Sequence, residues 1–279
     1  MIRSITALFG FSVRQTVFSL RIWVTLLLLA APSGLTLLAR YFESAARLQA
    51  VWERYHGCMQ YLMFMLVIPL VCMLHGTAMI GTEAEGGTLV YLLTRRLRRA
   101  VVLLVRFAAT ALVLVLLLEA ATCVHHLCAV GGVDIESLGG PRQSSSGAPW
   151  RPAGELAAYL CVVPMGVVSY LAVFTLIGLA AKRPITVSII YLAAIDLAVG
   201  SLPVGARMYT ISDQLRRTML DAMPKLAGLY NLPGDLHALL YPPGSTGTGA
   251  LVFVTLVALL LSCVLITVRE LAAAELARE

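Results

Sequence analysis

The stretch that decides the fold is Gly249-Ala-Leu-Val-Phe-Val-Thr-Leu-Val-Ala-Leu-Leu-Leu-Ser-Cys-Val-Leu-Ile-Thr-Val268, which contains no charged residue. A helix rises about 1.5 Å per residue, so a segment of this length matches the roughly 30 Å hydrocarbon core of a bilayer. In hydrocarbon every backbone N–H and C=O must be bonded within the segment, and a helix meets that requirement. The stretch therefore predicts a membrane-spanning helix.

The composition of the whole chain also favours a lipid environment. Of 279 residues, 59% are apolar and 13% are charged, whereas soluble domains have about 45–50% and about 25%. Further segments have the length and the low charge of a span, so that the predicted spans lie at about 22–39, 58–80, 100–124, 155–181, 185–203 and 249–268. We therefore predict an all-α integral membrane protein with six transmembrane helices, which form a single domain over residues 1–279.

Positive charges predict the orientation, because Lys and Arg are retained in the cytoplasm. The densest basic cluster lies in the short segment between the second and third predicted spans and consists of Arg95, Arg96, Arg98 and Arg99. We therefore expect this segment to be cytoplasmic, and an even number of spans then places both termini there. The net charge of +6 is explained by this orientation, so no nucleic-acid partner is expected. The expected location is the bacterial cytoplasmic (inner) membrane.

The residues before the first span predict an amphipathic helix over 2–20. Apolar residues recur there at steps of three and four, while Arg3, Arg14 and Arg21 share another face of the helix. Such a helix is expected to lie in the inner membrane interface. The alternative is a cytoplasmic extension of the first span.

Two outer segments differ in composition. The segment from about His125 to Gly154 is rich in Gly and Ser, which predicts a flexible loop. The outer loop 204–248 contains apolar residues at a spacing near 3.6, which predicts a short helix on the outer surface or dipping into the membrane, with Pro224 ending it.

The segment 81–99 reads Gly81-Thr-Glu-Ala-Glu-Gly-Gly-Thr-Leu-Val-Tyr-Leu-Leu-Thr-Arg-Arg-Leu-Arg-Arg99. Its two acids can pair with basic groups of a soluble partner, its glycine pair permits a bend, and Thr88 can cap a short helix. The four arginines would anchor the far end to anionic lipid or to an acidic protein surface. The alternative is an ordinary positive-inside loop without a partner. The residues expected to contact a partner are Glu83, Glu85, Gly86, Gly87, Thr88, Leu89, Leu92 and Leu93.

This segment resembles the cytoplasmic loop of the permease subunits of ABC transporters of the type-2, exporter-like class. In that family an acidic residue precedes Gly-Thr-Leu and Leu-Leu-Thr, and a basic end leads into the third span. The matching residues here are Glu83, Glu85, Gly87, Thr88, Leu89, Leu92, Leu93, Thr94, Arg95 and Arg99. Family members often have Pro directly after the first basic residue, where this chain has Arg96.

The resemblance implies that residues 83–93 dock onto a separate nucleotide-binding ATPase subunit and that two permease chains pair to form the translocation path. It also implies export, and a transport subunit that is not itself an enzyme. A phosphate-binding loop needs Gly-x-x-x-x-Gly-Lys, and the stretch Gly244 to Gly249 has the glycines without the lysine. ATP and Mg²⁺ are therefore expected in the partner ATPase, and no cofactor is expected in this chain.

Two acids fall inside predicted spans, where an ionisable group costs at least a few kcal/mol and faces protein or water. Glu119 and Asp196 can line a substrate path or can bond between helices. Cys123, His125, His126 and Cys128 are residue types that suit a soft metal. On a helix Cys123, His126 and Cys128 do not all share one face, so we expect interfacial packing and no metal site.

Two other functions stay open from the sequence. One is an intramembrane enzyme that acts on a lipid or a lipid-linked substrate with Glu119, Asp196 or the pair His125 and His126, which would have to converge in one cavity. The other is a membrane anchor subunit, which needs no path through the helices.

Overall fold

The computed structural model describes residues 2–42, 48–79, 99–131, 152–199, 210–223 and 247–276. Within these ranges the chain forms helices and no strand. Five segments are long and apolar enough to cross a membrane, which is the pattern of a multi-pass membrane protein. These segments are Leu20–Phe42, Glu53–Gly76, Ala100–Val130, Ala153–Ala180 and Gly247–Val268.

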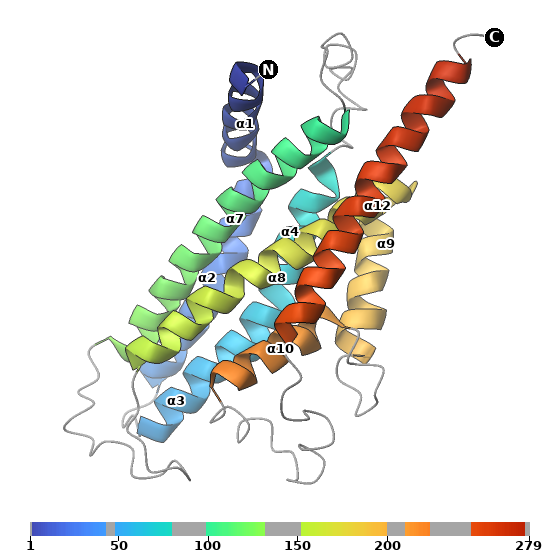
Figure 1. Ribbon diagram of the computed structural model, residues 1–279. Coiled ribbons are helices and arrows are strands. Elements are labelled where there is room, and N and C mark those ends of the chain that lie inside the picture. Colours follow the sequence, from blue (N-terminus) through green and yellow to red (C-terminus); the bar gives the residue numbers. More distant parts are fainter. Residues whose placement is uncertain are drawn as a thin grey trace.

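The long helices run back and forth through one bundle (Figure 1), and α1 begins at the same end of it at which α12 finishes. In chain order the elements are α1 (Ile2–Val17), α2 (Leu20–Phe42), α3 (Leu48–Gly57), the π-helix η1 (Cys58–Val67), α4 (Ile68–Gly76), α7 (Arg99–Val130), α8 (Pro152–Ala180), α9 (Pro184–Ile190), the π-helix η2 (Tyr191–Val199), α10 (Ile211–Ala222) and α12 (Gly247–Leu276). The predicted all-helical fold is confirmed for the described residues.

The predicted span 185–203 is described only as far as Val199. There α9 and η2 follow one another without a break, but the apolar helix is shorter than the five others. The remainder of that span lies outside the described residues, so six spans stay a prediction.

Several helices extend beyond the predicted spans, and α12 continues past Val268 to Leu276. The second span was expected to begin at Cys58, but helix α3 already begins at Leu48. The predicted loop from His125 is wrong at its start, because α7 continues to Val130. An apolar run marks only the part of a helix that lies in hydrocarbon. The polar turns at its ends form the same backbone hydrogen bonds, so the helix is longer than its apolar run.

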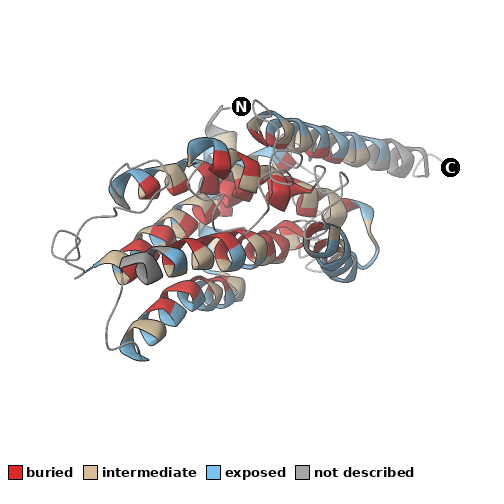
Figure 2. Ribbon diagram, turned by 90° about the horizontal axis from the view of Figure 1, so that it is seen from below, coloured by how far each residue is buried: buried red, intermediate tan, exposed pale blue. Residues whose placement is uncertain are grey.

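The core of the bundle lies between η1, α4, α7 and α8, and Figure 2 shows the buried residues gathered in the middle. Helices α4 and α8 approach closely where both carry glycine. A Cβ added at Gly76 would lie 2.9 Å from the Cβ of Phe174, and one added at Gly178 would lie 3.0 Å from the Cα of Thr77. Small residues allow such contact between helix backbones, which is how helices associate in lipid.

Helix α12 contacts the bundle through a narrow stripe. Leu251, Ala258 and Ser262 are buried, and Thr255 between them bonds to Ser169 of α8 over 2.9 Å. As far as Val268, most other apolar side chains of the helix are exposed, which Figure 2 shows as pale blue along the helix that leads to the label C. A long apolar face of this kind needs an apolar solvent, and lipid supplies one.

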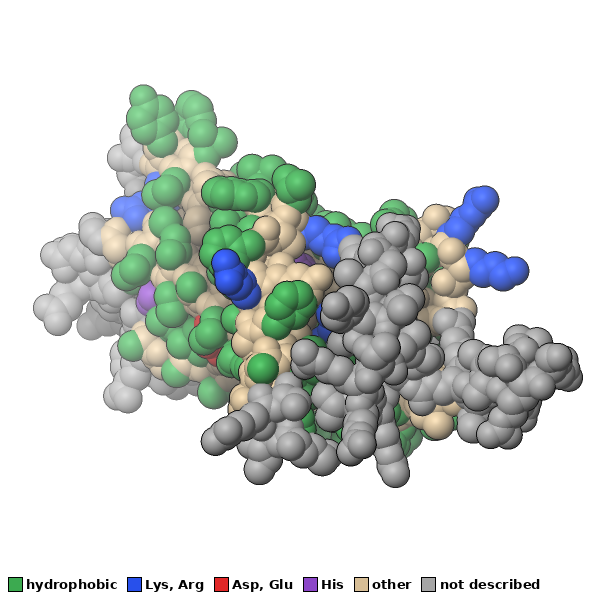
Figure 3. Space-filling view, turned by 90° about the horizontal axis from the view of Figure 1, so that it is seen from above, with side chains coloured by type: hydrophobic (Ala, Val, Ile, Leu, Met, Phe, Trp, Pro, Cys, Tyr) green, Lys and Arg blue, Asp and Glu red, His purple; other side chains and the backbone are tan. Residues whose placement is uncertain are grey.

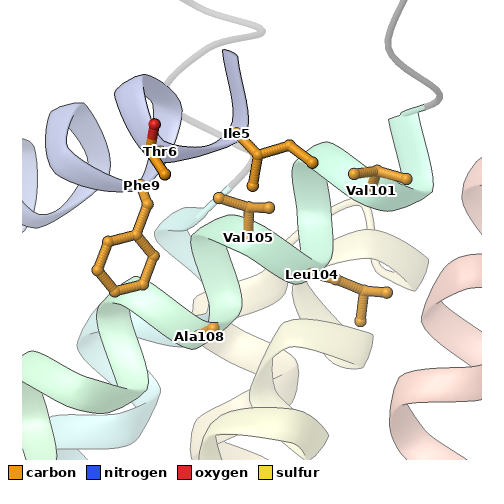
Figure 4. Close-up of a pocket in the computed structure, with 7 residues that line it drawn as sticks. All are labelled: Ile5, Thr6, Phe9, Val101, Leu104, Val105 and Ala108. Carbon is orange, nitrogen blue, oxygen red and sulfur yellow. The ribbon is translucent and has the colours of Figure 1, made fainter. Parts of the chain in front are cut away.

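Helix α1 is separated from α2 by a turn at Phe18 and Ser19 and packs along the first turns of α7. Between them lies an apolar crevice with a volume of about 390 Å³ (Figure 4), lined by Ile5, Thr6, Phe9, Val101, Leu104, Val105 and Ala108. The helix predicted over 2–20 is therefore present over Ile2–Val17, while its position in a membrane interface stays a prediction.

The short helix predicted within 204–248 is confirmed as α10. Thr210 caps it, because its side chain accepts a hydrogen bond from the backbone N–H of Asp213. The helix packs against α8 and α12 at glycines: a Cβ at Gly166 would lie 3.0 Å from Leu215, and one at Gly247 would collide with the carbonyl oxygen of Gln214. Buried residues on α10 make it part of the bundle rather than a surface helix.

We expect Gly178→Ala to lower the stability of the bundle, because the added methyl would lie 3.0 Å from the Cα and 3.1 Å from the carbonyl oxygen of Thr77. Overpacking of this kind costs roughly 1–3 kcal/mol. Gly34→Ala is the matched control, since its Cβ would meet nothing within 4 Å. Thermal unfolding of both variants in detergent provides the measurement, and equal melting temperatures would contradict the close approach of α4 and α8.

Candidate functional site

The first buried polar group, the His56 cluster, joins α3, η1 and the start of α8. It consists of His56, Gln60, Glu155 and Tyr159. Nδ1 of His56 lies 2.6 Å from the hydroxyl oxygen of Tyr159, and Nε2 of His56 lies 2.9 Å from Oε2 of Glu155. All four residues are buried. Their mutual hydrogen bonds stabilise these polar groups, because a buried polar group without a hydrogen-bond partner costs free energy.

The bonds of the His56 cluster form a directed chain. Gln60 Nε2 donates to the Tyr159 oxygen over 3.5 Å. With the His56 proton on Nε2, the Tyr159 hydroxyl donates to Nδ1 and Nε2 donates to Glu155, so Tyr159 and His56 each donate and accept while Glu155 accepts. A Tyr, His and carboxylate in series can take up or pass on a proton, and such chains are typical of functional polar sites in membrane proteins.

Aromatic contacts extend the cluster to α7. The ring of Tyr55 stacks on His125 at 5.5 Å with an interplanar angle of 16°, and it meets His126 and Tyr159 edge-on at 5.3 and 5.7 Å. The Thr36 hydroxyl of α2 lies 3.5 Å from Nδ1 of His125. Side chains from four successive crossings therefore meet at this end of the bundle.

The end of α7 is fixed to α2 by Arg40. Its Nη1 donates to the carbonyl oxygens of Cys128 and Gly131, over 2.7 and 2.8 Å. A cation at the carboxyl end of a helix complements the partial negative charge there. Among the described residues no group of three His, Cys, Asp or Glu side chains has a geometry that could hold a metal ion, and the two histidines that the sequence singled out here are in ring contact with Tyr55.

The second buried polar group, the Asp196 cluster, joins η2, α8 and α10. The Tyr170 hydroxyl donates to Oδ2 of Asp196, and the backbone N–H of Ser212 donates to Oδ1 over 3.2 Å. The Ser212 hydroxyl also donates to the Asp196 carbonyl oxygen over 3.3 Å. Next to it, Arg217 and Asp213 form a buried ion pair within α10 at 2.8 Å. Asp196 therefore bonds between helices.

Both clusters lie at π-helical segments. Gln60 lies in η1, about one helical turn after His56, and Asp196 lies in η2. π-Helical turns are rare and are frequently found at functional sites. The two clusters are the best candidates for a functional site among the described residues.

The other predicted site residues are placed as follows. The contact residues Glu83 to Leu93 and the arginines Arg95 to Arg98 lie outside the described residues, and Arg99 is described only by its backbone, as the first residue of α7. Glu119 is half-buried on α7 and takes part in none of the bonds of the two clusters. Asp196 and the pair His125 and His126 belong to different clusters, so the described contacts do not bring them into the one cavity that an intramembrane enzyme would need.

The sequence interpretation did not find the His56 cluster. His56 lies just before the predicted second span and Glu155 at the first residue of the predicted fourth, so the pattern of apolar residues singles out neither. The available signal was one His and one acid at the same predicted outer end of neighbouring spans. Whether these two side chains face each other depends on how each helix is rotated about its axis, and the pattern of apolar residues does not define that rotation.

Comparison with known proteins adds no relative: no family model and no curated protein sequence matches this chain.

We expect Tyr159→Phe to lower stability by about 1–3 kcal/mol, because it leaves His56 and Gln60 in a buried site without their shared partner. The ring contacts with Tyr55 are kept, so the effect isolates the hydroxyl. Tyr41→Phe is the control, since the Tyr41 side chain of α2 is exposed. Thermal unfolding in detergent measures both, and an unchanged Tyr159→Phe protein would show that the hydroxyl bonds contribute nothing.

Asp196 and Tyr170 are expected to be energetically coupled. In a double-mutant cycle, the variant with both Asp196→Ala and Tyr170→Phe should lose less stability than the sum of the two single losses, by at least about 0.5 kcal/mol. The reason is that either change alone already removes the same bond. The free energy of unfolding of the four proteins gives the coupling. Strict additivity would exclude a stabilising bond between them.

Proposed function

We propose that this chain is the membrane-spanning permease subunit of an ATP-driven ABC transporter, acting in export, with ATP hydrolysis in a separate nucleotide-binding subunit. The observation that carries the proposal is the sequence between α4 and α7, where two acids, a glycine pair, Thr-Leu, Leu-Leu-Thr and four arginines follow one another.

The arrangement of the helices supports this proposal. The finish of α4 and the start of α7, which flank the segment 81–99, lie at the same end of the bundle as the start of α1 and the finish of α12 (Figure 1). Exposed Lys182 and Arg183 follow α8, and Arg14 is exposed on α1. Seen from this end, Lys and Arg side chains project from the rim (Figure 3). Basic residues favour the cytoplasmic side, where an ATPase would bind.

In the proposed topology, α9 and η2 supply the sixth crossing and both termini are cytoplasmic. Helix α1 then lies at the inner membrane interface, and the His56 and Asp196 clusters lie inside the bundle at the level of the outer half of the membrane. A second permease copy would cover part of the exposed apolar surface of the bundle. The partners are therefore the ATPase, a second permease and lipid, in a bacterial inner membrane.

The proposed mechanism is mechanical. Closure of the ATPase pair on ATP would move the segment 83–93, which the chain connects directly to α4 and α7. Because α4 is in close contact with α8 at Gly76 and Gly178, displacement of α4 acts on α8 as well. Helix α8 carries Glu155 and Tyr159 of one cluster and Tyr170 of the other, so both clusters lie on helices that this movement would reach.

The test is purification of the tagged full chain in mild detergent after co-expression with a neighbouring-gene product that carries Gly-x-x-x-x-Gly-Lys. We expect the wild type to retain an active ATPase. The double reversal Glu83→Arg, Glu85→Arg should release the ATPase or uncouple its activity, because like charges would then face the basic groups of the partner.

The matched control is the double reversal Glu53→Arg, Asp221→Arg, which changes the charge equally at exposed residues of α3 and α10, at the other end of the bundle. It should leave ATPase retention unchanged. Failure of the wild type to retain any ATPase would overturn the permease proposal and favour an anchor or enzyme role. Equal losses in both double variants would overturn the assignment of the coupling segment.

A further inference from the structure

Three of the five histidines of the chain meet around one phenol ring. The centroid of the Tyr55 ring lies 4.9, 5.5 and 5.3 Å from those of His56, His125 and His126, respectively. His56 is 0% exposed and His125 is 1% exposed, whereas His126 is 9% exposed. His126 therefore has the most contact with the molecular surface, and among these three imidazoles it is the one that a proton reaches most readily.

His126 also differs from His56 in its hydrogen bonds. Both ring nitrogens of His56 are bonded, one to Tyr159 and one to Glu155. Nδ1 of His126 is buried without a hydrogen-bond partner among the described residues, and so is the hydroxyl of Tyr55, whose ring meets that of His126 edge-on. The large majority of buried polar groups are hydrogen-bonded, so two unpartnered groups in ring contact need a functional explanation.

Glu155 supplies the negative charge at this point of the bundle. Its carboxylate bonds to His56, and its charge also acts on His126 and on Tyr55. A buried imidazolium is stable only with an opposite charge nearby, and Glu155 can provide that charge to His126 as well as to His56. The described titratable and charged side chains around these rings are Tyr55 and His56 of α3, Cys58 of η1, Glu155 and Tyr159 of α8, Cys123 and His125 of α7, and Arg40 of α2.

We propose that His126 is a reversible proton-binding site and that Glu155 compensates the charge of its imidazolium. A proton needs no cavity, which agrees with the close packing of the rings around Tyr55. The carboxylate is then shared between His56 of α3 and His126 of α7, so proton uptake strengthens the connection of α3 and α7 to α8. In the proposed topology the proton comes from the outer side. The site needs no ATPase partner, so it stands or falls separately from the proposed permease function.

The experiment is NMR of the full chain in detergent micelles, with ¹⁵N-labelled histidine side chains followed between about pH 5 and pH 8, the range in which imidazoles titrate. His126→Gln identifies the His126 signals. We expect the His126 ring to take up one proton within this range. Glu155→Gln should lower the proton affinity of His126 at least about tenfold, because it removes the compensating charge. The amide oxygen of the new side chain can still accept from Nε2 of His56, and monodisperse, helical protein is required of every variant.

Glu119→Gln is the matched control, because Glu119 is a half-buried acid about two turns earlier on α7 and belongs to neither cluster. It should leave the His126 titration unchanged. A His126 ring that stays neutral down to about pH 5 would overturn the site, and so would equal midpoints in the wild type and in Glu155→Gln, or equal shifts in Glu119→Gln and Glu155→Gln. The first of these outcomes needs only the wild type and His126→Gln, so it decides the proposal even if Glu155→Gln does not fold.

Discussion

The structure depends on one physical constraint: hydrocarbon, unlike water, cannot form hydrogen bonds with backbone N–H and C=O groups. In hydrocarbon each helix must satisfy its own N–H and C=O groups, and the polar side chains within the spans obey the same demand. The hydroxyls of Thr36, Thr122, Thr175 and Ser262 each donate to the carbonyl oxygen four residues earlier, over 2.7 to 2.9 Å. These side chains are compatible with lipid because their own helix supplies the acceptor.

Association of the helices has a different origin, since lipid removes most of the hydrophobic advantage of helix contact. Two devices replace it here. Glycines bring α4 and α8 into backbone contact and give α10 its place between α8 and α12. Bonds between helices, from Thr25 to His75 at 3.0 Å and from Tyr170 to Asp196, then define how the helices are rotated. Close packing determines the distance between helices, and polar bonds determine which faces meet.

The sequence predicted the helices well and missed the His56 cluster, and both outcomes have one cause. Length and absence of charge identify a helix in lipid, so five predicted spans and the amphipathic α10 are present. The same signal carries no information on polar turns, so it missed the start of α3 and the last turn of α7 that carries His125 and His126. Asp196 was recognised as an intramembrane acid, but its partners Tyr170 and Ser212 are ordinary residues whose role depends on helix rotation. The segment 81–99 was predicted from its motif, which does not depend on packing.

The narrow contact stripe of α12 has an evolutionary consequence. A side chain that touches only hydrocarbon is selected for being apolar and not for its shape, so Phe253, Leu256 and Leu260 can be exchanged among Leu, Ile, Val and Phe with little effect. Ala258, Ser262 and Thr255 have no such freedom, because a larger residue would push the helix away from α8. Substitutions should therefore accumulate rapidly on one side of this helix and slowly on the other, and two chains of this architecture can retain the same layout after most of their identical residues are lost.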